Sequence, residues 1–118
     1  MMNQRQLKAY YDKKQKLRET VLTLEGLREY QFKQNIPELD QELAAMETEI
    51  QTKSAELGTE SAAILSTLEA VTDAVCRTLL TLHFHKGLSW KEVSACTGLS
   101  ASAAKLRAYR AMKPVIPK

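Results

Sequence analysis

Three cationic side chains, Lys105, Arg107 and Arg110, stand close together near the carboxyl end of the chain. Lys and Arg donate hydrogen bonds to phosphate oxygens, and both also donate to guanine edges in the major groove of DNA. On a helix, Lys105 and Arg110 would lie on or beside one face, where we expect them to bind phosphates or base edges. Arg107 is expected to reach the phosphate backbone. The full set of candidate DNA contacts is Lys91, Ser102, Lys105, Leu106, Arg107, Tyr109 and Arg110.

Cap and turn residues predict two short helices that would position these side chains. Ser89 followed by Glu92 is a capping box, so a helix should begin at Trp90. Gly98 falls where a chain leaves a helix through a left-handed residue, and Ser100 then caps a second helix. Two short helices joined by a brief glycine-containing turn are typical of a helix-turn-helix. Its second helix would read a DNA major groove.

The same stretch resembles region 4 of the sigma-70 family of RNA polymerase sigma factors, and the likeness covers roughly the last third of the chain. It rests first on Arg77, Leu80, Leu82, Phe84, Gly87, Leu88, Ser89, Glu92 and Val93, and then on Gly98, Leu99, Ser100, Lys105, Arg107, Arg110 and Ala111. The resemblance implies groove contacts that include Ser102, early in the second helix. A long helical front before such a domain also resembles small phage- and prophage-encoded regulators of Gram-positive bacteria.

Three positions depart from the sigma pattern. Sigma factors often have Val or Ile where Ala104 stands, Leu where Ala108 stands and Ala where Ser94 stands, so a thinner core and an unusual recognition surface are expected. The resemblance implies RNA polymerase as a further candidate partner. A chain of 118 residues leaves no room for the other regions of a sigma factor, so we do not expect a complete one.

No other combination of residues predicts catalysis or metal binding. We find no acid paired with a loop histidine, no phosphate-cradling glycine run and no nucleophile elbow, and we expect neither enzyme activity nor a cofactor. His83 and His85 would lie on nearly opposite sides of a helix, which is poor geometry for a shared metal ion. Cys76 and Cys96 have no second pair to complete a zinc site, so reduced, partly buried thiols are expected.

Charge is distributed unevenly along the chain, although the overall net charge is only +3. Residues 1–35 carry a net charge of +4, residues 36–73 carry −8 and residues 74–118 carry +7. The basic last segment fits a DNA-binding end. No stretch approaches the roughly 18 apolar residues of a membrane span, and the first residues are polar, so we expect a cytoplasmic protein without a signal peptide.

The first half predicts a long antiparallel helical hairpin in an all-α protein. Residues 3 to about 34 contain no proline and repeat apolar side chains at three- and four-residue steps. Asn35, Ile36 and Pro37 should break this helix. A heptad pattern follows, which favours a coiled coil with the first helix. Its members are Leu39, Leu43, Met46, Ile50, Lys53 and Leu57.

Gly58 is expected to end or bend the second helix, and a third helix should then run from about Ser61 to His85. A continuous helix through Gly58 is the alternative. The corresponding domains are residues 1–60, the hairpin, and residues 61–118, the helix-turn-helix domain. A short tail should follow Met112.

The sequence thus predicts a DNA-binding transcriptional regulator, phage or prophage encoded, that binds double-stranded DNA and forms a homodimer or higher homo-oligomer through its hairpin. One alternative is a phage DNA-packaging protein of the small-terminase type, or another DNA-scaffolding protein, in which both parts build a ring. Another alternative is a coiled-coil interaction protein without DNA binding. Salt-sensitive DNA affinity and oligomer size separate the three classes.

Overall fold

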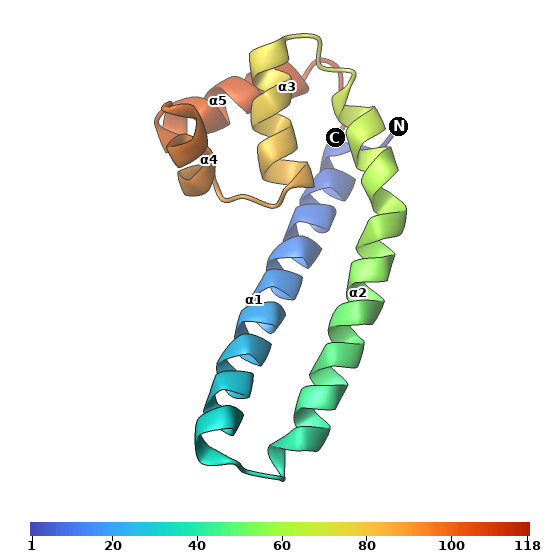
Figure 1. Ribbon diagram of the computed structural model, residues 1–118. Helices are drawn as coiled ribbons and strands as arrows, with labels where there is room; N and C mark the ends of the chain where they lie inside the picture. Colours follow the sequence, from blue (N-terminus) through green and yellow to red (C-terminus); the bar gives the residue numbers. More distant parts are fainter. The chain divides into compact units, whose positions relative to one another are not determined.

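The computed structural model describes all 118 residues and contains helices without any strand (Figure 1). This confirms the predicted all-α class. None of the helices combines the length and the apolar content that crossing a membrane requires. The elements in chain order are α1 (Gln4–Gln34), α2 (Leu39–Leu68), α3 (Ala74–Leu80), a π-helical turn η1 (Thr81–His85), α4 (Trp90–Thr97) and α5 (Ala101–Met112).

Helices α1 and α2 form the predicted long hairpin (Figure 1). The turn between them begins at Asn35, whose φ of 49° lies in the left-handed region that asparagine tolerates better than most residues. The amide side chain of Gln31 closes the turn, because its Oε1 accepts from the Ile36 N–H at 2.8 Å and its Nε2 donates to Asp40 at 2.9 Å. The break at Asn35, Ile36 and Pro37 is therefore confirmed.

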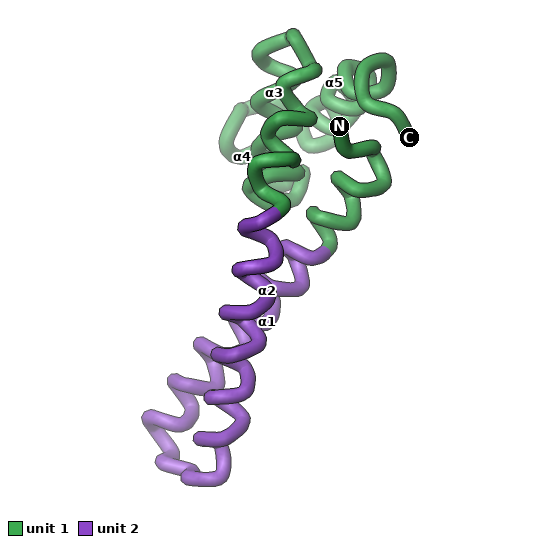
Figure 2. The backbone as a smooth tube through the Cα atoms, turned by 90° about the vertical axis from the view of Figure 1, so that its right-hand side faces the viewer, with its two compact units in different colours: residues 1–12, 60–118 green, residues 13–59 purple.

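The chain divides into two compact units (Figure 2). Unit 1 consists of Met1–Asp12 and Glu60–Lys118, and unit 2 consists of Lys13–Thr59. The sequence suggested a division at residue 60 alone, whereas the structure groups the first twelve residues with the carboxyl-terminal part. The physical reason is burial, since Leu7 and Tyr10 are core residues and the Gln4 N–H donates to the Pro117 carbonyl.

Unit 2 is a two-helix hairpin with a thin apolar seam. Leu24 and Leu57 are buried, but the heptad residues Leu43, Met46 and Ile50 are only half-buried. Lys53, at the heptad position between Ile50 and Leu57, is exposed. Across the hairpin, Arg28 pairs with Glu47, and both side chains remain about half exposed. An exposed ion pair of this kind contributes under about 1 kcal/mol, so it aligns the helices more than it stabilises them.

The predicted helix end near Gly58 is wrong, and the alternative of a continuous helix is confirmed, because α2 continues through Gly58 to Leu68. A glycine inside a helix costs only about 1 kcal/mol relative to alanine, which burial of apolar residues on the same helix offsets. The chain leaves the helix instead at residues 69–73. The predicted single helix from Ser61 to His85 is therefore divided into the end of α2, then α3 and η1.

A short tail follows Met112, as predicted, and it packs against the rest of unit 1. Ile116 is buried, and its carbonyl accepts from the Gln4 side-chain amide at 2.8 Å. The Met2 N–H also donates to Thr67 Oγ1 at 3.0 Å, within the same unit. Residues near both ends of the chain therefore take part in the packing and hydrogen bonding of unit 1.

Candidate nucleic-acid interface

Helix α4 begins where the capping box was predicted. Ser89 Oγ accepts from the Glu92 N–H, and Glu92 Oε1 accepts from the Ser89 N–H, each at 3.2 Å. These two bonds satisfy donors that a helix start otherwise leaves without partners. The predicted helix start at Trp90 is confirmed.

The turn between α4 and α5 also follows its sequence signals. Gly98 has a φ of 78° and adopts the left-handed conformation that terminates α4. The Ser100 side chain then accepts from the Ala103 N–H at 3.1 Å and caps α5. Gly98, Leu99 and Ser100 form the whole connection between α4 and α5, so the two helices are joined by a short turn.

One side of α5 is buried through small residues. Ala104 and Ala108 are fully buried, and Met112 follows one turn later on the same side. Through this side α5 packs against both α3 and α4. Small side chains allow close helix approach. The opposite side of α5 is consequently turned outward by this packing.

Four of the predicted contact residues share the outward side of α5. All four are exposed. Ser102, Leu106 and Arg110 follow one another at four-residue steps along the side opposite Ala104 and Ala108, and Lys105 lies on the flank of this stripe. The surface defined by these four residues is called the α5 outer face below. It combines two cations, one hydroxyl and one leucine that is 53% exposed.

Arg107 does not belong to the α5 outer face. Helical spacing puts it on the flank of Leu106 opposite Lys105. Hydrogen bonds from the Cys76 backbone and side chain lower the pKa of Asp73, and the positive charge of Arg107 adds to this shift. The Cys76 thiol in turn lies 3.8 Å from the Arg107 carbonyl, and burial raises its pKa. Arg107 is exposed near the start of α3, and Lys91 is exposed in the first turn of α4.

Tyr109 is half-buried and faces an aromatic cluster. Its ring lies 6.3 Å from Phe84 and 6.0 Å from Trp90, between ring centroids, and burial raises the pKa of its hydroxyl. Trp90 itself stacks on His83 at 4.1 Å. Trp90 is half-buried within this packing. Tyr109 therefore packs against the aromatic cluster and is not one of the exposed residues of the α5 outer face.

The π-helical turn η1 brings His83 into this cluster. The Lys86 N–H donates to the Thr81 carbonyl at 3.0 Å across the widened turn, and both His83 and Phe84 are buried. His83 Nδ1 lies 2.7 Å from the Leu88 carbonyl, so this nitrogen carries the proton. Tyr11 covers the other side of the ring at 4.1 Å. This stack fixes the loop that leads into α4.

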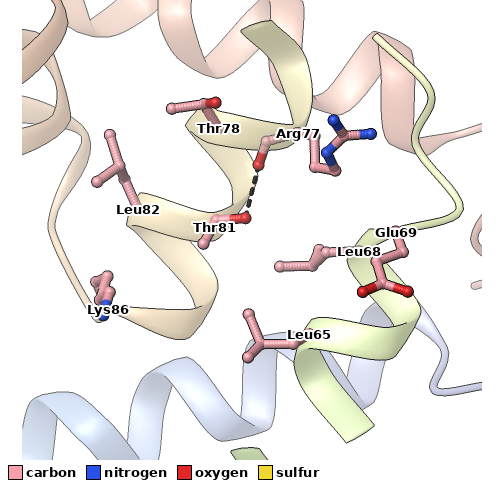
Figure 3. A pocket seen from close by; sticks show the side chains of 8 residues that line it. All are labelled: Leu65, Leu68, Glu69, Arg77, Thr78, Thr81, Leu82 and Lys86. Atoms are coloured by element: carbon pink, nitrogen blue, oxygen red, sulfur yellow. Dashed lines mark hydrogen bonds between the residues drawn. The ribbon is translucent and has the colours of Figure 1, made fainter. Parts of the chain in front are cut away.

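A separate hollow of about 340 Å³ lies between the end of α2 and α3 with η1 (Figure 3). Leu65, Leu68 and Leu82 give it apolar walls. The Thr78 hydroxyl donates to the Ala74 carbonyl and the Thr81 hydroxyl to the Arg77 carbonyl, so neither donates to a ligand in this arrangement. None of the predicted DNA contacts lines this hollow.

Another hollow, of about 410 Å³, was not foreseen from the sequence and lies beside Arg107. Ala74, Val75 and Leu79 of α3 face Thr97 and Leu99 across it. Val75 is apolar, yet its side chain is about half exposed. No sequence signal distinguishes it from the buried Leu79.

No protein-family model, curated protein or solved structure matches this chain.

Proposed function

We propose that this protein binds double-stranded DNA through a helix-turn-helix formed by α4 and α5, and that it regulates transcription. One observation carries the proposal: the capped α5 buries only small residues and Met112, and it exposes Lys105, Leu106 and Arg110. A helix fits the major groove, and cations on its outer side can neutralise phosphates. The resemblance of the stretch to sigma-70 region 4 supports the same assignment.

The roles within the interface follow from position. Lys105 and Arg110 stand one on each side of Leu106 in the α5 sequence and have the reach for phosphates or base edges. Ser102, near the start of the helix, has a short side chain that allows close approach to a groove. Arg107 and Lys91 lie outside the α5 outer face and would contact the phosphate backbone.

Self-association through the hairpin completes the proposal. Leu43, Met46 and Ile50 keep part of their apolar surface exposed in unit 2, which a second copy of the hairpin could cover. Two-fold dimers are the commonest symmetric assembly and would present two α5 helices to DNA. RNA polymerase is a partner suggested by the sigma-like stretch alone.

The same half-buried seam also favours two other functions. A ring that packages or organises DNA would use the hairpin as its subunit contact, and a coiled-coil interaction protein would use it to hold a different partner. The first differs from a regulator in forming a large closed ring, and the second in lacking salt-sensitive DNA affinity.

Selection of bound sequences from random duplex DNA, with the mass of the free protein and of the complex measured in solution, tests the proposal. A regulator predicts a recovered sequence motif and a dimer-sized complex. Recovery of DNA without a motif on a large ring would favour packaging. A protein that binds no duplex DNA at low salt would contradict the proposed DNA binding.

A further inference from the structure

Leu106 is an apolar side chain at the middle of the otherwise polar α5 outer face. It is 53% exposed, and it points away from the buried Ala104, Ala108 and Met112. Single exposed leucines are common on protein surfaces and alone need no explanation. The neighbours of Leu106 on this face make its position informative.

Short side chains precede Leu106 by one helical turn, and long cationic side chains flank it. Ser102 and Ala103 are both exposed and leave the helix slim at its start. Lys105 and Arg110 extend further from the helix and carry the charge of this face. A helix of this shape can enter a major groove about 12 Å wide. Leu106 would then contact the base edges while the two cations contact the phosphates on either side.

The chemistry of the groove floor then limits what Leu106 can recognise. Leucine neither donates nor accepts a hydrogen bond, so it cannot read the donor and acceptor pattern of a base pair. Among base edges in the major groove, thymine alone presents an apolar group, its C5 methyl. Burial of one such methyl group against leucine corresponds to about a fourfold gain in affinity.

We propose that Leu106 reads thymine methyl groups, so that α5 prefers double-stranded DNA that presents thymines at the centre of its site. This inference rests on the proposed function and specifies its ligand. Hydrogen bonds from Lys105 and Arg110 orient α5 on the DNA, and Leu106 supplies the preference for thymine.

Replacement of thymine by deoxyuridine tests the inference directly, because uracil lacks the methyl group but keeps every hydrogen-bonding group. Duplexes from the random selection are prepared with thymine or with uracil throughout, and affinities are measured by fluorescence anisotropy at one salt concentration. The intact wild-type protein should bind the thymine duplex about fourfold more tightly for each methyl contacted.

Two variants assign this preference to the leucine. Leu106→Ala and Leu106→Gln should bind thymine and uracil duplexes equally, and their thermal melting should match that of the wild type because the side chain is exposed. Leu65→Ala is the matched control, since Leu65 is another exposed leucine of unit 1, outside α5. It should keep the full preference for thymine.

The outcomes separate this inference from the proposed function. Equal wild-type affinity for both duplexes, with salt-sensitive binding intact, would overturn the role of Leu106 and leave DNA binding in place. A thymine preference that survives in both Leu106 variants would assign methyl recognition to another side chain and also overturn it. Absence of binding to every duplex would overturn both proposals.

Discussion

The imidazole of His83 lies nearly parallel to the indole of Trp90, with 4.1 Å between ring centroids and 15° between ring planes. Tyr11 stacks on the opposite side at the same centroid distance. Burial between these rings lowers the pKa of His83 to about 4, the Leu88 carbonyl opposes this shift, and the charge of Lys105 adds to it. The folded protein therefore keeps His83 neutral where a free imidazole would be charged.

This shift predicts that stability falls with pH in a defined window. The unfolded chain binds a proton at His83 near its ordinary pKa of 6.5, whereas the folded chain binds it near 4. Between these values the unfolded state holds the extra proton, so the free energy of unfolding decreases as pH falls from 6.5 toward 4. The full loss is at most about 3 kcal/mol. Urea unfolding at about pH 7, about 6 and about 5 measures it.

His83→Phe is the control for this pH dependence. The variant keeps an aromatic ring in the stack but has no group that titrates, so its free energy of unfolding should change less between about pH 6.5 and pH 5. Carboxylates titrate mainly below this range. An equal pH dependence in the wild type and in His83→Phe would contradict the assignment of a buried neutral imidazole.

Alanine at two glycines should shift stability in opposite directions. Gly98 has a φ of 78°, so Gly98→Ala should destabilise the protein, by roughly 1–3 kcal/mol. Gly58 lies inside α2, and the space that an added methyl group would occupy is open, so Gly58→Ala should stabilise the protein by about 0.5–1 kcal/mol. Thermal melting of both variants is the measurement. A Gly98→Ala protein as stable as wild type would show that the turn tolerates a side chain.

Local signals made the second half of unit 1 predictable from the sequence. Ser89, Glu92, Gly98 and Ser100 each act through hydrogen bonds or backbone angles within four residues. Such short-range effects do not depend on the rest of the fold. The ends of α4 and α5 therefore follow from the residues themselves. The break between α1 and α2 was predictable for the same reason, from Asn35 and Pro37.

Tertiary packing decided the features that the sequence did not reveal. Leu68 and Val71 are both buried, one at the end of α2 and the other in the loop that follows, so apolar periodicity continues across a true helix end. The signal for that end is Asp73, whose carboxylate accepts from the Cys76 N–H at 2.9 Å as the cap of α3. Burial of His83 could not be read from spacing, because it depends on the widened turn η1.

Charged side chains in the hairpin seam should abolish self-association. Leu43→Asp together with Ile50→Asp places two carboxylates at half-buried heptad positions, so monomers or unfolded chains are expected. Sedimentation velocity and circular dichroism separate these two results. Gln51→Asp is the control for added charge, because Gln51 is exposed on the same helix. A wild-type protein that sediments as a monomer at micromolar concentration would contradict the seam as a subunit contact.

The acidic segment should restrain nonspecific DNA binding by the basic one. Residues 36–73 carry a net charge of −8 in the same chain as a segment of +7, and nonspecific affinity arises from phosphate neutralisation. Glu42→Gln with Glu49→Gln should therefore increase affinity for random duplexes at low salt. The difference should shrink near 0.1 M salt, where screening limits such effects to about 10 Å.

Glu47 is left unchanged in that experiment because it pairs with Arg28 across the hairpin. The variant Gln51→Ala, which removes no charge from α2, serves as the reference. Unchanged affinity in the doubly neutralised protein at every salt concentration would make the acidic segment purely structural. The intact chain is required, since Met1–Asp12 belongs to unit 1 and a fragment beginning at residue 61 would lack it.

The salt dependence of DNA affinity in Lys105→Ala and Arg110→Ala tests DNA binding by the α5 outer face. Affinity falls as salt rises, and removal of a side chain that binds a phosphate should make this fall less steep, by about 1 in the slope of log affinity against log salt. Removal of a side chain that reads a base should weaken binding to the selected sequence by roughly 1–3 kcal/mol. Lys33→Ala, which removes an equal charge from exposed surface in unit 2, should leave the slope unchanged. We expect losses in the two α5 variants alone. Identical affinities and slopes in the wild type and all three variants would contradict DNA binding by the α5 outer face.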